Sequence, residues 1–243
     1  MPIRKLKFYP GNLYHLFNRG NAKQAIFNND KDRYRFLQGL YISNNSNAKF
    51  GLTHLESHKT GFTLLEIKDI FEQKGIDYEP FVKIYADCLM PNHYHLLVEE
   101  VREGGIVQFM QRSGNSYARY FTTKYKRPGS LFQGRFKAVQ VETDDQLKYL
   151  LAYINIVNPA QILEPKLKEV GVKSFDSIWN FADNYNWSTH QEFMGRRESI
   201  LIHGSDILNE MFRNSDEYSK FVKDVLHGKE RNLWPAINGL ALE

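Results

Sequence analysis

Cysteine is almost absent from this sequence of 243 residues, in which Cys88 stands alone. A single cysteine excludes a disulfide framework and a cysteine-based zinc site. No run of residues is long and apolar enough to predict a membrane-spanning helix. The first residues include basic side chains but no apolar stretch with a small-residue cleavage site, so we expect no secretion signal. These absences predict a soluble protein of the cytoplasm.

Aromatic residues are plentiful, with 3 Trp, 14 Tyr and 17 Phe. Large rings supply the buried area that offsets the conformational entropy of the chain, so a packed core is expected. The length suits one ordinary domain, or one domain with a sizeable appendage. The sequence contains no nucleophile elbow and no glycine-rich phosphate loop.

The net charge of +4 is unevenly distributed along the chain. Residues 102–140 carry eight basic side chains and one acidic side chain, whereas the rest of the chain is nearly neutral. Such clustering is typical of proteins that bind a phosphate backbone. A solvated helix face would show the same excess, so charge alone leaves both interpretations open.

Hydrophobic periodicity predicts strands that alternate with helices. We expect strands at 13–18, 81–88, 93–99 and 135–141, and helices at 30–41, 63–74, 105–125 and 144–158. The last of these helices is expected to end before Pro159, and shorter amphipathic helices follow it. This order, with a hairpin turning at 90–92, predicts an α+β sandwich with an antiparallel sheet.

Two histidines, His93 and His95, open the expected strand 93–99. Side chains at positions i and i+2 point to the same face of a strand, so the two imidazoles converge. Neutral imidazole is a ligand for Mn, Zn and similar ions. The spacing alone is weak, because two surface histidines on an edge strand would show the same pattern.

Two tyrosines, Tyr149 and Tyr153, lie four residues apart on one face of the helix 144–158. A phenol can attack phosphorus as a covalent nucleophile, but its pKa near ~10 means that it needs help from a metal or a neighbour. Tyrosine on an amphipathic helix usually belongs to the core, so this pattern too is open without its context.

The segment 131–137 interleaves aromatic and basic side chains around Gly134. Phe132 stands close to Arg135 and Lys137, and aromatics beside arginine can stack unpaired bases and hold phosphates. An ordinary strand with a bulge explains the same pattern equally well.

Taken together, the segments 14–37, 85–99, 109–142 and 149–162 resemble the REP-associated tyrosine transposases, which belong to the HUH class of single-strand DNA transposases. A weaker match lies at 185–195. The resemblance implies a ferredoxin-like sandwich with helices on one face of the antiparallel sheet. It places the catalytic domain at 1–159, with an insertion of unassigned role at about 45–78, and an α-helical extension at 160–243.

The chemistry that the resemblance implies is cleavage and rejoining of single-stranded DNA near hairpins, without hydrolysis. His93 and His95 fall on the His-hydrophobic-His signature, which implies that they bind a divalent metal ion, Mg or Mn. Tyr153 falls on the nucleophilic tyrosine and would form a 5′-phosphotyrosine intermediate, with Tyr149 as the fallback nucleophile.

One departure concerns the asparagine that usually follows the nucleophile by four residues and could complete the metal site. Here Val157 occupies that position and Asn158 follows at the fifth. A π-bulge could restore Asn158 to the metal-binding face, the third ligand could differ, or the nucleophile could be another tyrosine.

The resemblance implies single-stranded or hairpin DNA as the partner, no membrane, and a bacterial-type, nucleoid-associated location; a homodimer is compatible with it. The side chains expected to contact DNA are basic, with one aromatic ring among them: Arg19, Arg112, Arg119, Lys124, Arg127, Phe132, Arg135 and Lys137.

Three other functions are also compatible with the sequence. A domesticated hairpin-binding protein without turnover is favoured by the displaced Asn158 and disfavoured by the intact His93, His95 and Tyr153. A relaxase or replication-initiator nuclease would share the chemistry. A zinc hydrolase would need a third ligand, and the spacing recommends neither His15 nor His58.

Overall fold

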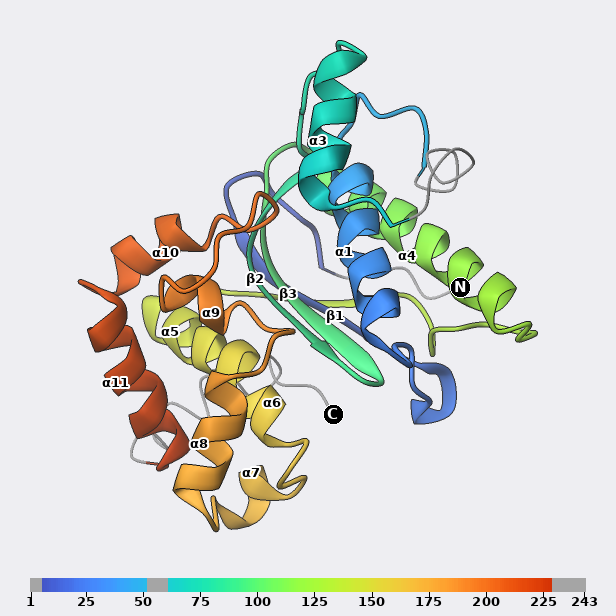
Figure 1. Ribbon diagram of the computed structural model, residues 1–243. Helices are drawn as coiled ribbons and strands as arrows, with labels where there is room; N and C mark the ends of the chain where they lie inside the picture. Colours follow the sequence, from blue (N-terminus) through green and yellow to red (C-terminus); the bar gives the residue numbers. More distant parts are fainter. Residues whose placement is uncertain (1–5, 52–60, 229–243) are drawn as a thin grey trace.

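The computed structural model describes residues 6–51 and 61–228, which fold around a four-stranded sheet (Figure 1). The strands are β1 (Leu13–Arg19), β2 (Val82–Met90), β3 (His93–Glu100) and β4 (Lys137–Gln140). Their order is β2-β3-β1-β4, and all neighbours are antiparallel. With helices connecting β1 to β2 and β3 to β4, this is the ferredoxin-like α+β arrangement that the sequence predicts.

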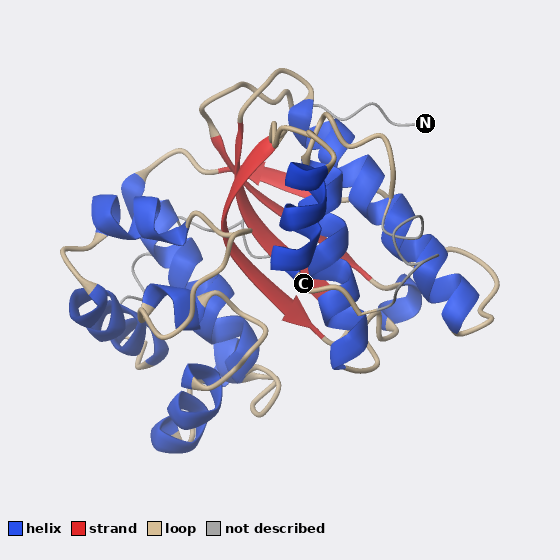
Figure 2. Cartoon of the chain, turned by 45° about the horizontal axis from the view of Figure 1, so that its top comes forward, coloured by secondary structure: helices blue, strands red, loops and turns tan. Residues whose placement is uncertain are grey.

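Two long helices, α1 (Asp30–Asn44) and α4 (Gly105–Lys124), cover one face of the sheet as expected (Figure 2). Alternate strand residues such as Leu16 and Leu96 point into this layer and form its core. The segment at about 45–78 contributes α3 (Leu64–Gln73), which begins at a capping box between Thr63 and Glu66. Residues 52–60 of that segment lie outside the described residues.

The opposite face of the sheet is covered by the chain that follows β4 (Figure 1). Its elements are α5 (Asp144–Ala152), the π-helical turn η2 (Tyr153–Val157), α6 (Asn158–Ala160), α7 (Leu167–Val170), α8 (Phe175–Asp183), α9 (His190–Phe193), α10 (Gly204–Met211) and α11 (Ser215–Leu226). Cys88 and Leu97 of the sheet share a hydrophobic core with Ile178 of α8 and Val222 of α11. The helical extension therefore packs onto the sheet itself.

One expected boundary is wrong, because the helix after Thr143 does not end before Pro159. It widens into the η2 turn and continues as α6 through Pro159 and Ala160. Pro159 lies in the first turn of α6, and because it has no N–H the carbonyl of Asn155, four residues earlier, receives no helical hydrogen bond from it. Among the described residues, no helix is long and apolar enough to cross a membrane.

Candidate active site

The two histidines of β3 project from the sheet face that carries the extension. Their ring centroids lie 5.0 Å apart, and His95 is 1% exposed. In the antiparallel register His93 lies opposite Arg19 and His95 opposite Phe17, so β1 supplies the neighbouring side chains on this face. The convergence expected from the i, i+2 spacing is present.

A third imidazole, that of His15 on β1, was not predicted to belong to the site. Its Nε2 lies 2.8 Å from Nδ1 of His95, and His15 is fully buried. Linear spacing could not reveal it, because the contact depends on the pairing of β1 with β3. His15 stands two residues before Phe17 on the same strand face, and Phe17 lies opposite His95. Knowledge of this strand register would have placed His15 beside the site.

The hydrogen-bond partners of His93 and His95 determine which ring nitrogen of each has a lone pair available for a ligand. The Nδ1 atom of His93 lies 2.6 Å from the side-chain oxygen of Asn92, an acceptor, so Nδ1 carries the proton and Nε2 the lone pair. Nε2 of His95 is buried without a hydrogen-bond partner among the described residues. A proton there would leave an unsatisfied buried donor, so we assign it to Nδ1, which donates to His15. Both imidazoles therefore offer Nε2.

The phenol of Tyr153 meets these imidazoles from the η2 turn. Its ring centroid lies 5.5 Å from that of His95 and 6.3 Å from that of His15, and Tyr153 is 1% exposed. Tyr149 lies one turn earlier in the core, where burial raises the pKa of its phenol. The structure thus brings the predicted nucleophile to the predicted metal ligands.

The π-helical turn answers the question raised by the spacing of Asn158. In this turn the backbone N–H of Asn158 bonds to the carbonyl of Tyr153, five residues earlier. Asn158, five residues after Tyr153, therefore lies one π turn beyond it. In an α-helix, a residue four positions after Tyr153 would lie in the equivalent place. Of the three explanations open from the sequence, the π-bulge is the one that is present.

Two buried atoms bear on whether a metal ion fits here. Nε2 of His95 and the side-chain nitrogen of Asn158 are both buried without hydrogen-bond partners in the described part of the chain. The side-chain oxygen of Asn158 accepts a hydrogen bond from the side-chain nitrogen of Gln161. Which end of an asparagine amide is oxygen and which is nitrogen is assigned from hydrogen bonds of this kind. Residues 6–51 and 61–228 contain no cluster of three His, Cys, Asp or Glu side chains arranged for a metal. The two imidazoles fit a divalent ion that also takes phosphate oxygens and water, whereas Asn158 would join them only through its amide oxygen, which here accepts from Gln161.

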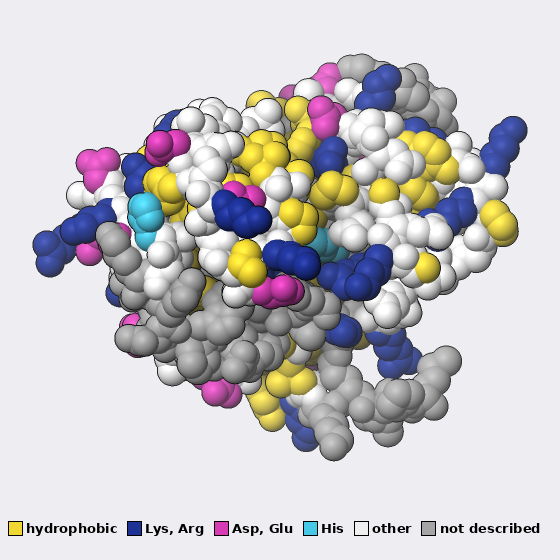
Figure 3. All heavy atoms as spheres, turned by 90° about the horizontal axis from the view of Figure 1, so that it is seen from below, with side chains coloured by type: hydrophobic (Ala, Val, Ile, Leu, Met, Phe, Trp, Pro, Cys, Tyr) yellow, Lys and Arg dark blue, Asp and Glu magenta, His cyan; other side chains and the backbone are white. Residues whose placement is uncertain are grey.

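Burial, aided by the positive charges around the site, keeps its imidazoles neutral. Burial, together with the positive charges of Arg19 and Lys168, lowers the pKa of His93 to about 3. Burial likewise holds the pKa of His95 well below its usual range. Figure 3, which views the molecule from below Figure 1, shows Lys and Arg side chains around a recessed histidine near the middle of the view. The site is therefore positive, with neutral ligands inside it.

Lys168 of α7 is a second residue that the sequence did not single out. Its Nζ donates a hydrogen bond of 3.0 Å to the phenol oxygen of Tyr153 and lies 4.5 Å from the centroid of that ring. A lysine fifteen residues after the tyrosine, in a four-residue helix, has no local signature. The extension thus places a charged group beside the phenol oxygen of Tyr153.

Three of the predicted DNA contacts line one groove on the α1/α4 side of the sheet. Arg119, Phe132 and Arg135 surround a cavity of about 690 Å³ between α4 and the loop that follows it. Asn18 and Tyr94, from the ends of β1 and β3, form part of its floor. The groove and the imidazole site therefore lie on opposite faces of the same strand ends.

The remaining predicted contacts are placed elsewhere. Arg112 donates to the backbone carbonyls of residues 45 and 48, and Lys124 is held at 2.6 Å by the buried carboxylate of Asp32. Arg127 lies in the loop that follows α4. Lys137 lies opposite Phe17, on the imidazole face with Arg19. Arg112 and Lys124 are thus engaged within the fold, away from the groove lining.

Comparison with known proteins finds a family match over part of the chain. Residues 58–156 match the family model described as "Transposase IS200 like". Among solved structures, a REP-associated tyrosine transposase bound to a REP hairpin is 13% identical, with a TM-score of 0.44, covering 81% of this chain and 87% of that one. The tRNA(His) guanylyltransferase of Saccharomyces cerevisiae is 10% identical, with a TM-score of 0.33, covering 91% and 80%. No curated protein matches the sequence.

Of these similarities, only the family match bears on the residues of the site. At such identities and TM-scores the two solved structures carry no functional argument. The matched segment contains His93, His95 and Tyr153, and ends before Asn158. Neither His15 nor Lys168 falls within it, so both are additions that only the structure reveals.

Proposed function

We propose that this chain, whose residues 58–156 match the IS200-like transposase family, cleaves and rejoins single-stranded DNA next to hairpins through a covalent link on Tyr153. The observation that carries the proposal is the meeting of that phenol with the imidazole of His95, 5.5 Å between ring centroids. The displaced Asn158, which favoured a binding protein without turnover, is accommodated by the η2 turn. Cleavage and rejoining therefore account for more of the site than binding alone.

The proposed reaction exchanges one phosphate ester for another. The phenol oxygen of Tyr153 attacks the scissile phosphorus, so that the tyrosine–phosphate bond forms and the bond from phosphorus to the 3′ oxygen breaks. The phenol gives up its proton and the departing 3′ oxygen takes one up, leaving a 5′-phosphotyrosine and a free 3′-hydroxyl. Because this link keeps the free energy of the phosphodiester, another 3′-hydroxyl can attack it and join a strand.

The side chains around the phenol have separate roles in this proposal. A divalent ion, Mg²⁺ or Mn²⁺, held by Nε2 of His93 and of His95 and by the Asn158 amide, would polarise the scissile phosphate when bound. His15 orients the ring of His95 through the hydrogen bond at Nδ1. Lys168 stabilises the negative charge that develops on the phenol oxygen as its proton leaves.

Replacing Lys168 with methionine keeps the length of the side chain and removes its charge. We expect the rate of adduct formation to fall about 10- to 100-fold, because the phenol oxygen loses a charged donor. Single-turnover kinetics on a labelled hairpin oligonucleotide measures this rate. Lys166→Met, an exposed position two residues earlier, is the matched control. An unchanged rate in Lys168→Met would remove the lysine from the reaction.

The groove on the α1/α4 side is the proposed seat of the hairpin. Arg119 and Arg135 would contact phosphates, and Phe132 would stack an unpaired base. A strand that leaves the groove at Asn18 and Tyr94 reaches the imidazole face by passing the ends of β1 and β3. The arrangement supports hairpin binding and cleavage on two sides of one sheet.

Arg119→Ala and Arg135→Ala are expected to weaken hairpin binding several-fold each. Both should also flatten its salt dependence by about one counterion, since each phosphate contact on duplex DNA contributes about 0.9 to the slope. Affinity titrations at several salt concentrations measure both quantities. Lys74→Ala, at the exposed end of α3, is the control that should change neither. Equal affinities and slopes in all four proteins would place the hairpin elsewhere.

The whole proposal is tested by incubating the wild-type protein with a labelled hairpin oligonucleotide and Mn²⁺. A nicking and joining enzyme yields a denaturation-resistant protein–DNA band, and mass spectrometry of the tryptic peptide locates the nucleotide on Tyr153. A salt-sensitive mobility shift without the covalent band would instead identify a hairpin-binding protein without turnover.

A further inference from the structure

The η2 turn is held from outside by a buried hydrogen-bond relay that belongs to the extension. We propose that Thr189, His190 and Tyr218 are positioning residues that keep this π-helical turn in register, so that Tyr153 and Asn158 share one side of the site. The inference rests on the function proposed above and assigns to the extension a role in the active site itself. It also gives a purpose to the sequence around Trp187, which the proposed chemistry does not use.

The relay is attached to Asn155, the middle residue of the turn. Thr189 Oγ1 donates to the side-chain oxygen of Asn155 at 2.6 Å, and the side-chain nitrogen of Asn155 donates to the hydroxyl of Tyr218 at 2.9 Å. Asn155, Thr189 and Tyr218 are all fully buried. Both ends of one amide are therefore fixed, two residues after Tyr153 and three before Asn158.

The hydrogen bonds of the relay have a single direction. The Tyr218 hydroxyl accepts from Asn155 and donates to Nδ1 of His190 at 3.0 Å. Burial lowers the pKa of His190, so its ring is neutral, and its Nε2 donates to the carboxylate of Asp183 at 2.9 Å. Arg196 closes the chain on the second oxygen of that carboxylate at 3.0 Å. Every donor has an acceptor, so the network rigidifies what it holds.

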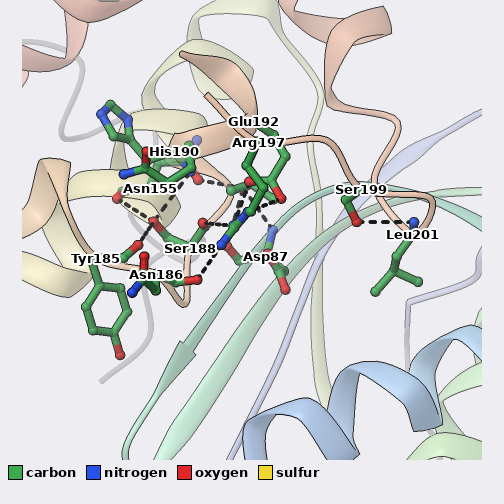
Figure 4. A network of polar contacts seen from close by, with 12 residues as sticks. Asp87, Asn155, Tyr185, Asn186, Ser188, His190, Glu192, Arg197, Ser199 and Leu201 are labelled. Carbon is green, nitrogen blue, oxygen red and sulfur yellow. Dashed lines mark hydrogen bonds and ion pairs between the residues drawn. The ribbon is translucent and has the colours of Figure 1, made fainter. Parts of the chain in front are cut away.

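A second contact secures the backbone of the same residue. Pro159 has no N–H, so the carbonyl of Asn155, four residues earlier, lacks the helical donor it would otherwise receive. The hydroxyl of Ser188 donates to that carbonyl at 3.2 Å and takes its place. Figure 4 shows Ser188 and His190 gathered around Asn155.

The segment that carries the relay is also tied to the sheet. The backbone of Thr189 donates to the carbonyl of Asp87 at 3.1 Å, and Leu89 donates to the carbonyl of Trp187 at 2.8 Å. Cys88, between these two β2 residues, lies directly opposite His95 in the sheet. The same segment therefore contacts the turn that bears the phenol and the strand next to the imidazoles.

External support of this kind is what a π turn requires. A wide turn with i to i+5 hydrogen bonds is rare as a free-standing structure and occurs mostly as single turns at functional sites. Relaxation to an α-helix would move Asn158 by about 100° around the helix axis relative to Tyr153, since α-helical residues are spaced at 3.6 per turn. The relay holds the phenol and the amide together against that relaxation.

Thr189→Val removes the hydroxyl with little change of shape, and Thr189→Ser restores it. In the valine variant we expect adduct formation to slow about 10- to 100-fold, because a displacement of about 1 Å at the reacting atoms costs that much. Mn²⁺ binding, followed by electron paramagnetic resonance without DNA, should weaken about tenfold. Hairpin affinity should stay unchanged, and serine should restore rate and metal binding together.

Two further variants serve as a control and as a second test of the relay. Ser199→Ala, which loses a contact to the backbone of Leu201 elsewhere in the extension, should match the wild type in every measurement. Tyr218→Phe removes the central hydroxyl of the relay and repeats the test should the valine variant fold poorly. Wild-type rate and Mn²⁺ affinity in both Thr189→Val and Tyr218→Phe would overturn the inference. A wild-type protein that binds Mn²⁺ but forms no adduct would overturn the proposed function alone.

Discussion

Replacing Tyr153 with phenylalanine will leave hairpin binding intact and abolish the covalent protein–DNA adduct. The phenol oxygen is the atom that would bond to phosphorus, and phenylalanine has no oxygen at that position. The loss should reach about 10³-fold or more, as for removal of other covalent nucleophiles. Denaturing electrophoresis of the Mn²⁺-dependent reaction measures the adduct, and a mobility shift measures binding.

Tyr149→Phe is the matched control for this experiment. Tyr149 lies on the same helical face four residues earlier, in the core, and it is the fallback nucleophile that the sequence leaves open. Its variant should form the adduct at the wild-type rate. Adduct formation by Tyr153→Phe, together with its loss in Tyr149→Phe, would move the nucleophile to Tyr149.

Replacing His95 with glutamine should have the second-largest effect on the reaction. The variant keeps a polar side chain but loses the imidazole nitrogen that is buried without a partner in the described structure. Mn²⁺ affinity should fall sharply and adduct formation by about 10²- to 10³-fold, because several kcal/mol of charge stabilisation at the phosphate are lost. His203→Gln, ahead of α10, is the control that should retain both.

The pH dependence of metal binding supplies an independent check on these histidines. Metal ions compete with protons for imidazole, and an ordinary histidine loses the contest below about pH 6.5. Burial lowers the pKa of His93 to about 3 and that of His95 well below its usual range. We therefore expect Mn²⁺ affinity to stay flat from about pH 8 to pH 5. A steep fall near pH 6.5 would mean that the imidazoles are solvated.

The same pKa shifts determine how the stability of the fold depends on pH. A histidine whose pKa is lower in the folded chain than in the unfolded chain binds fewer protons when folded. The free energy of unfolding is then greatest above the ordinary histidine pKa and decreases as the pH falls below it. His190 should act in the same direction as His93 and His95, because burial lowers its pKa too.

Much of the fold is predictable from local patterns. The expected helix 105–125 is α4 at Gly105–Lys124, and the expected strand 93–99 is β3 at His93–Glu100. Alternation and helical spacing are properties of neighbouring residues, which is why these elements can be located. The strand order then follows from the topology of the ferredoxin-like arrangement.

The site was predictable only where it rests on such local spacing. His93 and His95 share a strand face by their i, i+2 positions, and the π turn was foreseen as one of three explanations for Asn158. His15 and Lys168 were not, because their contacts join residues brought together by strand register and by the packing of α7.

The number of basic residues in a segment likewise predicts its DNA contacts only in part. Lys124 belongs to the basic block of the sequence, yet its ammonium is paired with Asp32, 92 positions earlier, inside the helical layer. Arg112 likewise binds two carbonyls of the segment after α1. A count of basic residues does not reveal which of them the fold has already neutralised or engaged. The domain boundary at 159 and a homodimer stay predictions.

The outer edge of β2 is closed by the chain's own extension, and this limits how two copies could associate. Backbone hydrogen bonds from residues 187, 189 and 203 occupy that edge between Ile84 and Leu89. The unpaired backbone N–H and C=O groups of an open strand edge can pair with a strand of a second molecule, whereas a covered edge has no such groups available. A continuous sheet across two protomers would therefore have to run through β4, at the far side of the sheet.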